Sequence, residues 1–500
     1  MAQQLDALVT VEEVSGLASK LKRRKAVGPD LVYNEFIRFS SRRFLEILAK
    51  FYSLLLYNGH YPTEWKIARV VMALKPGKTP DGLDSFRPIS VTSNLGKLFE
   101  RILLNRIVRT GVESIVIPNN QLAYRAGSSA ALALQMFTTQ VHQIINSRGY
   151  VVAVALDCSK AFDTVSHRIL TNEINRVIPG KIAKVLESFI SQRTFFVVKG
   201  TARSSTYSLK SGVPQGGIFS PFLFNLYLAT LPRAREETRH IQFADDFLIY
   251  SMAEDPENAT RLLQAHLDKV NDWCYDYGLR LNPEKSSSQF FYKNSKKPLS
   301  DLKLYLGTKA IPRDDRFSYL GVRLDRKLNY EHTITEIGKK VIKMGFALRK
   351  LFYRYPRTRW KIRGLLFKVC VRSLILYALP LLLSATRVQW VRVEAAETVA
   401  LRAIFGRSDN YEGLLGRAEA QPIYQVYKEL SNRFATKLVR PSHWELLEIF
   451  DLEEGAYPTS LFEAVRGLNP EFLDNLATIK SVAEFVSFER ERQMREEGDP

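Results

Sequence analysis

Hydrophobic and polar positions repeat along this chain with two periods, and each period predicts a different kind of element. Residues 150–156 (YVVAVAL) are almost wholly apolar and rich in β-branched side chains, which predicts a buried strand ending at Asp157. Residues 195–199 are a second strand candidate. The middle third of the chain therefore contributes strands to a buried sheet.

Two more apolar runs flank a pair of acidic residues. Residues 240–244 lead into Asp245 and Asp246, and residues 247–250 (FLIY) follow them. We expect two strands here, joined by a tight turn that holds both aspartates at its tip.

Helical periodicity begins directly afterwards. Residues 256–277 place their apolar side chains on one stripe of a helix, namely Leu263, Leu267, Val270, Cys274 and Tyr277. Pro256 suits the start of this helix and Gly278 its end. Residues 341–351 and 362–383 also repeat at helical intervals. Strands, a hairpin and helices in this order predict an α+β fold with a palm-like sheet.

The charge of the chain indicates what kind of partner it binds. The chain has 500 residues, 46% of them hydrophobic, and a formal net charge of +20. This length predicts two or three domains, and the positive charge favours a polyanionic partner such as nucleic acid. Residues 337–393 contain 14 Lys or Arg and no acidic residue, whereas residues 441–500 contain 14 acidic and five basic residues. The basic helices would follow a nucleic-acid backbone, or they would simply present a solvated face.

Three cysteines, Cys158, Cys274 and Cys370, are widely separated. They predict neither a disulfide framework nor a zinc knuckle, and they suit a reducing compartment, the nucleus or the cytoplasm. The most apolar stretch, around Pro380, is about half the length that a membrane span needs, and the N-terminus lacks a signal-peptide pattern. We therefore expect no membrane association and no secretion.

Paired aspartates between apolar strands have a chemical use. Adjacent carboxylates at a buried turn repel each other and lose hydration, and a hard cation such as Mg²⁺ offsets both costs. With Asp157 as a third carboxylate, Asp245 and Asp246 would hold two ions about 4 Å apart for an in-line displacement. An ordinary surface turn is the alternative, and it is the commoner explanation for an isolated Asp-Asp pair.

Ordered sequence blocks favour the metal site. Residues 156–170, 211–232 and 243–250 resemble motifs A, B and C of reverse transcriptases. Five further blocks resemble the N-terminal extension, the fingers, the template block, motif D and the primer grip; they are 22–30 (KRRKAVGPD), 73–103, 121–130 (QLAYRAGSSA), 278–286 (GLRLNPEKS) and 317–325 (FSYLGVRLD). With its RPIS, SGVPQGG and FADD sequences, the chain resembles the reverse transcriptase of a LINE-type (non-LTR) retrotransposon, jockey-like in character.

This resemblance implies a right-hand polymerase with fingers, a palm built on an antiparallel sheet and a helical thumb. We expect the N-terminal extension and the start of the fingers in 1–70, fingers and palm in 71–330, the thumb in 331–410, and a helical region of unknown function in 411–500. The implied activity is RNA-directed DNA polymerisation, in which dNTPs are added to a primer 3′-hydroxyl. The implied partners are an RNA template and a DNA primer.

Roles in catalysis follow from the resemblance by position. Asp157, Asp245 and Asp246 would bind two Mg²⁺ ions, with Mn²⁺ as an alternative. Lys285 would donate a proton to the pyrophosphate leaving group or stabilise its charge.

Contacts with substrate and nucleic acid follow in the same way. Phe162 would be the aromatic gate that excludes a ribose 2′-hydroxyl, although plain core packing is its alternative role. The other expected substrate contacts are Gln215 and Gly216 beside the nucleotide, and Lys75 and Arg87 on the triphosphate. Expected nucleic-acid contacts are Arg125 on the template, Tyr319, Leu320 and Gly321 in the primer grip, and Lys339, Lys340 and Lys343 on the thumb.

Some positions depart from the family pattern, and other readings stay open. Val27, Tyr124 and Gly217 stand where Pro, a Gly-Phe pair and Ser are usual. The alternatives are a catalytically idle relic that binds nucleic acid, an RNA-dependent RNA polymerase, disfavoured by Phe162 and Ala244, and a group II intron maturase. The sequence leaves no room for an upstream endonuclease, so we expect nicking to come from another domain or protein.

Overall fold

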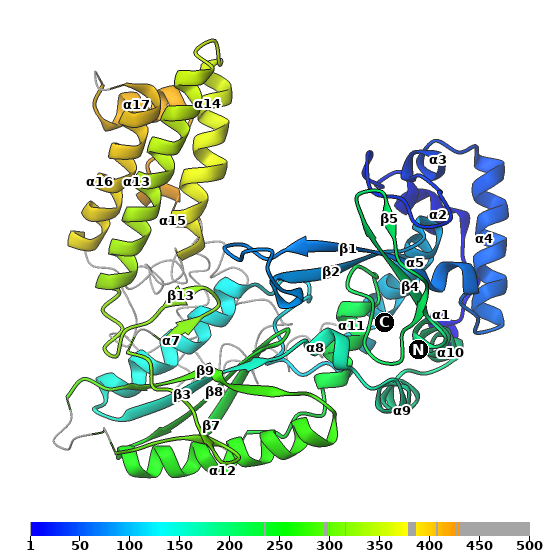
Figure 1. The fold of residues 1–500 in the computed structure, drawn as a ribbon, viewed down its shortest axis with the longest axis horizontal. Coiled ribbons are helices and arrows are strands. Elements are labelled where there is room, and N and C mark those ends of the chain that lie inside the picture. The colour runs from blue at the N-terminus through cyan, green and yellow to red at the C-terminus, as the bar shows by residue number, and fades with distance from the viewer. Residues whose placement is uncertain are drawn as a thin grey trace, which may run out of the picture. The chain divides into compact units, whose positions relative to one another are not determined.

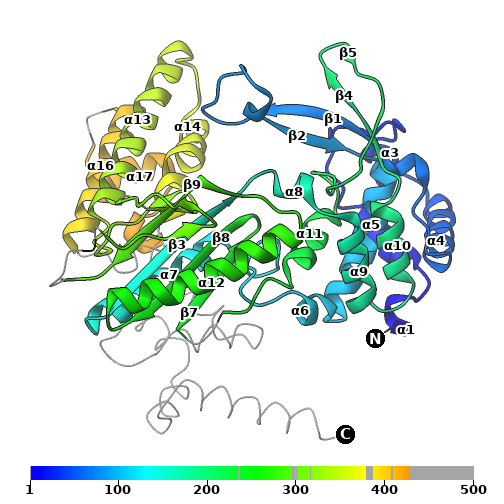
Figure 2. The same cartoon turned by 60° about the horizontal axis from the view of Figure 1, so that its bottom comes forward.

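A computed structural model describes residues 2–426 and 429, except for 235–236, 295–298, 300, 316, 379–386 and 407–408. The acidic residues 441–500 lie outside this described part. The chain forms two compact units. The first contains Met1–Tyr124, Asp157–Arg233 and Asp268–Asn282, and the second contains Arg125–Leu156, Ala234–Leu267 and Pro283–Pro500. Figures 1 and 2 show the elements from two directions.

A five-stranded sheet forms part of the first unit. Its strands run in the order β2 (Phe86–Val91), β1 (Ile67–Leu74), β4 (Thr194–Lys199) and β5 (Ala202–Arg203), and β6 (Tyr207–Ser208) also pairs with β4. β1 is antiparallel to β2 and parallel to β4. Pro88 is tolerated because β2 lies at the edge of the sheet. The strand predicted at 195–199 is thus confirmed.

The first unit also contains ten helices and two 3₁₀ turns among its described residues. The longest of these helices are α4 and α5. The helices are α1 (Ala2–Leu5), α2 (Val11–Ala18), α3 (Asn34–Arg38), α4 (Arg42–Tyr57), α5 (Asn94–Arg109), α6 (Val112–Val116), α8 (Ala161–Thr164), α9 (His167–Val177), α10 (Lys181–Ile190) and α11 (Ser220–Leu228). The 3₁₀ turns are Thr63–Lys66 and Leu83–Ser85. Ser and Thr side chains cap several of them; Thr10 and Glu13, for example, form a reciprocal capping box at α2.

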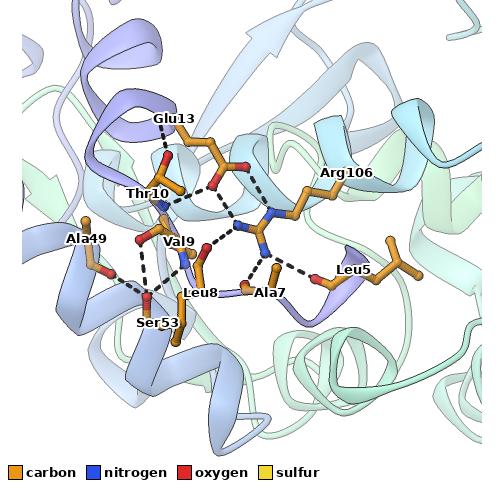
Figure 3. A network of polar contacts seen from close by, with 9 residues as sticks. All are labelled: Leu5, Ala7, Leu8, Val9, Thr10, Glu13, Ala49, Ser53 and Arg106. Carbon is orange, nitrogen blue, oxygen red and sulfur yellow. Dashed lines mark hydrogen bonds and ion pairs between the residues drawn. The ribbon is translucent and has the colours of Figure 1, made fainter. Parts of the chain in front are cut away.

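Arg106 of α5 fastens the N-terminal residues to the unit (Figure 3). Its guanidinium donates to both carboxylate oxygens of Glu13, at 2.9 and 2.6 Å. It also donates to the backbone carbonyls of Leu5, Ala7 and Leu8, at 3.2, 2.5 and 3.0 Å. A largely buried cation is stable here because each of its N–H groups faces an acceptor.

A four-stranded sheet with helices on both faces is central to the second unit. Its strand order is β7 (Thr238–Phe243), β8 (Asp246–Ala253), β3 (Tyr150–Cys158) and β9 (Leu281–Phe291), and its strands β7 and β8 are antiparallel. In β8, Tyr250 bonds to Gln140 of α7 (Ala130–Asn146), whereas the next residue, Ser251, donates to Ala259 of α12 (Pro256–Asp276) at 2.5 Å. Neighbouring strand residues point to opposite faces, so the two helices cover opposite sides of the sheet.

These observations confirm the strands predicted around the aspartates and the amphipathic helix that follows them. The stripe residues Leu263, Leu267, Val270 and Cys274 are buried as expected, whereas Tyr277, the fifth predicted member, follows the end of α12 and is half-buried. Two small hairpins come next, β10 (Tyr305–Leu306) with β11 (Lys309–Ala310) and β12 (Ser318–Tyr319) with β13 (Val322–Arg323). The second of these is the hairpin predicted at 317–325.

Helices make up the rest of the described second unit: α13 (Glu331–Arg354), α14 (Trp360–Leu366), a π-helical turn (Phe367–Arg372), α15 (Ser373–Ala378), α16 (Arg387–Phe405) and α17 (Tyr411–Ala418). α13 and α16 pack closely because Gly345 has no side chain; a Cβ there would lie 2.6 Å from the Cα of Ala400. The helices predicted at 341–351 and 362–383 are confirmed as far as residue 378, and residues 379–383 lie outside the described part. No helix among the described residues is both long and apolar enough to cross a membrane.

Candidate active site

The paired aspartates lie at a two-residue hairpin turn. Phe243 of β7 pairs with Asp246 of β8, so that Ala244 and Asp245 form the turn. Ala244 has φ of +58°, a left-handed conformation that is unfavourable for a residue with a Cβ. The neighbours Phe247, Leu248 and Ile249 are buried, and they anchor β8 in the sheet. Asp245 and Asp246 are both exposed, which is the arrangement expected for side chains that meet a ligand.

The third predicted ligand, Asp157, is the penultimate residue of β3 and is half-buried. β3 lies next to β8 in the sheet order. By chemistry the donors suit a hard divalent cation, because all three are carboxylates and none is a thiol or imidazole. Within the described part of the chain, no group of three His, Cys, Asp or Glu side chains lies close enough together to hold a metal ion.

A loop between residues 212 and 219 forms hydrogen bonds with the predicted gate residue and its neighbour. The Val213 amide donates to the carbonyl of Phe162 at 2.9 Å. The Gln215 side-chain amide donates to the carboxylate of Asp163 at 2.9 Å. The loop therefore binds the backbone of Phe162 and the side chain of Asp163. This brings Phe162 and Gln215, two predicted substrate contacts, close together.

Glycines allow the close approach of this loop to its surroundings. Gly212 has φ of +86°, and a Cβ there would lie 2.8 Å from the carbonyl oxygen of Asp163. Gly216 has φ of +133°, and a Cβ there would lie 2.4 Å from the carbonyl oxygen of Ser90. The Ser90 amide also donates to the Gln215 carbonyl at 2.8 Å. Only glycine fits both the conformation and the space at residue 216.

A cavity of about 280 Å³ lies between this loop and the sheet of the first unit. Its apolar lining includes Ala68, Val70 and Met72 of β1 and Val213 and Pro214 of the loop. Its polar lining residues are Ser90, Asp163, Arg193, Thr194 and Gln215.

Arg87 and Lys75 do not line this cavity. Arg87 pairs with Ala73 in the β1–β2 register, whereas the cavity residue Met72 pairs with Pro88, so Arg87 points to the other face of the sheet. Lys75 lies just beyond β1 and donates to the carbonyl of Asp84 at 2.9 Å. The structure thus places these two residues in the same hairpin, outside the cavity that Gln215 lines.

A buried carboxylate holds the end of the loop. Glu100 of α5 is fully buried and accepts hydrogen bonds from the Tyr61 hydroxyl at 2.7 Å and from the amides of Ile218 and Phe219 at 2.7 and 3.2 Å. Burial raises the pKa of Glu100, whereas Tyr61, the nearby buried Arg193 and the two amides favour its charged form. Glu100 thus ties α5 to the residues that begin α11.

The predicted primer-grip hairpin is near the aspartates in the second unit. The Tyr377 hydroxyl donates to the Leu320 carbonyl, and Asp246 contributes, after burial, to raising the pKa of both Tyr319 and Tyr377. One expectation needs correction: the Tyr319 side chain is 2% exposed and packs on Phe137 at 6.3 Å between ring centroids, so it does not face nucleic acid. Tyr319 does not contact nucleic acid because side chains alternate between the two faces of a strand, and that of Tyr319 points into the core. Leu320 and Gly321 form the accessible tip.

The remaining predicted contacts are at the surface. Lys339, Lys340 and Lys343 are exposed on α13, and Lys340 borders a cavity of about 540 Å³ beside the hairpin. Lys285 is exposed on β9, and Arg125 is half-buried in the turn that precedes α7.

Sequence reasoning missed the supporting residues Glu100, Asp163, Phe224 and Asn225. Asn225 is buried and donates to the carbonyl of Ala123 at 2.9 Å, so that α11 also holds the template block. A signal existed for two of them: Glu100 and Asn225 are polar residues inside apolar helical stretches (LFERIL and PFLFNLYL), where a buried polar side chain must have a partner.

Comparison with known proteins identifies the class. The family described as reverse transcriptase (RNA-dependent DNA polymerase) matches residues 74–324, which is half of the chain. The chain therefore belongs to the reverse transcriptase family, as its sequence blocks predicted. With it, the prediction of an α+β right-hand polymerase is confirmed.

Particular relatives come from insect mobile elements. The RNA-directed DNA polymerase from mobile element jockey of Drosophila melanogaster is 29% identical over 411 residues, covering 80% of this chain and 44% of the relative. The jockey protein of Drosophila funebris is also 29% identical, over 409 residues, with the same two coverages of 80% and 44%. The probable RNA-directed DNA polymerase from transposon BS of Drosophila melanogaster is 27% identical over 403 residues, covering 79% and 44%. The chain thus spans less than half the length of these relatives, and its resemblance to jockey-like, LINE-type enzymes is confirmed.

Among solved structures, that of apo telomerase from Candida tropicalis, truncated from its C-terminal domain, has a TM-score of 0.35 and 13% identity, covering 60% of this chain and 61% of that one. This likeness is too weak to inform the site.

Proposed function

We propose that this chain is the RNA-directed DNA polymerase of a jockey-like non-LTR retrotransposon and adds dNTPs to the 3′-hydroxyl of a primer paired to an RNA template. The observation that carries the proposal is the position of Asp245 and Asp246 at the tip of the β7–β8 hairpin, in a sheet where β8 neighbours β3, the strand that bears Asp157. Carboxylates on or next to the strands of a sheet suit a metal-dependent reaction, because the sheet keeps their backbone positions constant.

Asp157, Asp245 and Asp246 would hold the divalent ions, for which we propose Mg²⁺ with Mn²⁺ as a substitute. Two bound ions would activate the 3′-hydroxyl and stabilise the pyrophosphate leaving group. The aspartates themselves would fix the ions in place. Lys285 would supply positive charge or a proton on the leaving-group side.

The chain's own residues would select and orient the nucleotide. Phe162 would present its ring edge to the sugar, and the backbone at Gln215 and Gly216 would lie against the nascent base pair, because Gly216 leaves room for it. Arg87 and Lys75, in the β1–β2 hairpin, would bind the triphosphate.

Template and primer would bind through backbone contacts. Arg125 would hold a template phosphate, and Leu320 with Gly321 would position the primer end. In the proposed thumb, residues 331–410, the exposed Lys339, Lys340 and Lys343 would bind duplex phosphates without reading their sequence. These contacts would make duplex binding strongly dependent on salt.

Primer extension with a panel of substrates tests this proposal. The purified chain is given a DNA primer on an RNA template, with dNTPs or rNTPs, and with Mg²⁺ or with a chelator. We expect extension that requires both dNTPs and the divalent ion. Extension with rNTPs would indicate an RNA polymerase, whereas salt-sensitive binding of the duplex without any extension would indicate an idle relic.

A further inference from the structure

Phe162, the predicted sugar gate, stacks on a second aromatic ring, Phe224, to which the sequence motifs assign no role. Phe162 lies with its ring centroid 4.2 Å from that of Phe224, and the two rings are within 18° of parallel. Phe224 belongs to α11 and is fully buried, whereas Phe162 is half-buried. A stacked pair of this kind fixes the plane of the more exposed ring, because tilting it would separate the two faces.

A third ring limits the remaining freedom of Phe162. Tyr124 meets it edge-on, with centroids 6.4 Å apart and planes at 86°. Tyr124 is itself 56% exposed and has φ of +62°, so it is the more yielding of the two neighbours. Phe224 is the rigid one, because it is buried in α11 and Glu100 holds the residues at the start of that helix.

The backbone of the gate is fixed by the same part of the chain. The Phe162 carbonyl accepts from the Val213 amide at 2.9 Å, and Asp163 accepts from Gln215 at 2.9 Å. The loop before α11 thus fixes the position of the Phe162 backbone, and Phe224 within α11 fixes the plane of the Phe162 ring. A gate that excludes one hydroxyl group needs the backbone position and the ring plane of Phe162 to be constant, because a misplacement of about 1 Å in a site can change a rate about a hundredfold.

We propose that Phe224 is a specificity-determining positioning residue that holds Phe162 in the orientation that rejects ribonucleotides. Phe224 acts through Phe162 and does not touch the substrate. The proposal rests on the proposed polymerase function and on the gate role of Phe162. With a smaller residue at 224, the Phe162 ring gains room to tilt away, and a 2′-hydroxyl is then accommodated.

The test compares Phe224→Leu with Phe222→Leu in the full chain. Phe222 is also buried in α11 but lies about 200° around the helix from Phe224, so its loss weakens the same helix without touching the gate from the same side. Phe162→Val serves as the direct gate variant, and Phe224→Met, which nearly conserves volume, replaces Phe224→Leu if the latter does not fold.

Two readouts are used. The first is the ratio of kcat/KM for dCTP to that for CTP in single-nucleotide addition. The second is the ratio of the Kd values for CTP and dCTP on a primer that ends in a dideoxynucleotide. The second ratio is defined even if the protein adds no nucleotide, so failure of the polymerase proposal is seen separately, as a lack of dCTP addition by the wild type.

We expect Phe224→Leu to lower the discrimination about tenfold, chiefly by improving CTP, as the loss of a stacked pair would allow. Phe222→Leu should change overall activity but keep the wild-type ratio. The proposal is overturned if Phe224→Leu retains the wild-type ratio while Phe162→Val loses it, or if Phe222→Leu relaxes discrimination as much as Phe224→Leu does.

Discussion

Replacing Glu100 by alanine tests how the loop before α11 is held. The Glu100 carboxylate accepts from the Tyr61 hydroxyl and from the amides of Ile218 and Phe219, at distances from 2.7 to 3.2 Å. It also faces the buried guanidinium of Arg193. Alanine would leave three donors in the interior without their acceptor, and it would remove the negative charge that faces Arg193.

The expected cost follows from these contacts. Breaking a buried charge pair by removing one partner costs about 3–5 kcal/mol. Counted instead as hydrogen bonds, each buried donor left without an acceptor costs about 1–3 kcal/mol. The two figures describe one loss and are not added, so we expect Glu100→Ala to destabilise the first unit by about 4 kcal/mol. That is a large part of the total stability of a typical domain, about 5–15 kcal/mol.

Urea unfolding followed by circular dichroism would measure the overall change. Hydrogen exchange of a peptide covering residues 213–228 would show whether the loss is located at the loop and α11. Glu100→Gln, which keeps one acceptor oxygen, should cost less, about 1–3 kcal/mol. Glu46→Ala is the matched control, because Glu46 also lies on a helix but pairs with Arg42 at the surface; its cost should stay below about 1 kcal/mol.

Two results would refute this reasoning. One is a Glu100→Ala protein as stable as the Glu46→Ala control. The other is a destabilised protein whose exchange rises everywhere except in residues 213–228, because Glu100 would then stabilise some other part of the unit.

Three further expectations follow from the structure. Gly216→Ala should lower kcat/KM for dNTP addition by at least about tenfold, because its Cβ would meet the Ser90 carbonyl at 2.4 Å. Arg106→Met should lower the free energy of unfolding by about 3–5 kcal/mol, since it leaves Glu13 and three carbonyls without their donor (Figure 3). Burial lowers the pKa of His142 to about 4 from an ordinary 6.5, so the folded state resists protonation. Urea midpoints should therefore fall as the pH drops from about 6.5 to 4, and His142→Gln should weaken that dependence, to which His240 contributes in the same way because burial also lowers its pKa to about 4.

Each of these has a clear opposing result. An active Gly216→Ala protein would mean that the loop moves away from Ser90 without cost. An Arg106→Met protein of unchanged stability would mean that the N-terminal residues contribute nothing to the unit. An equal pH dependence with and without His142 would assign the acid sensitivity to other groups.

Local patterns predicted the elements that carry the aspartates. β3 is recognisable because its residues are apolar and β-branched, and the β7–β8 hairpin because two apolar runs flank Asp245 and Asp246. α12 is recognisable from its single buried stripe. In these places the pattern of burial is set by residues that are close together in the sequence, so the sequence alone is enough to predict the element.

Contacts between distant segments were beyond that reach. Glu100 bonds to amides 118 and 119 residues away, and the Phe162–Phe224 stack joins two motifs whose spacing along the chain says nothing of their distance in space. Tyr319 shows the opposite error, because its place in a motif suggested a nucleic-acid contact, whereas its strand turns it into the core. The π-helical turn at Phe367–Arg372 likewise interrupts a region whose periodicity predicted plain helix.

The central claim is that Asp245, with Asp246 and Asp157, holds the ions that drive nucleotide addition. The most direct test is the single-turnover rate of dNTP addition to a DNA primer on an RNA template, in Mg²⁺, for the wild type, Asp245→Asn and the exposed-acid control Glu254→Gln. We predict equal rates for the wild type and Glu254→Gln, and a rate at least about a thousandfold lower for Asp245→Asn, since a lost metal ligand costs several kcal/mol of transition-state stabilisation. A folded wild type that adds no nucleotide, or an Asp245→Asn rate within tenfold of the wild type, would contradict the account.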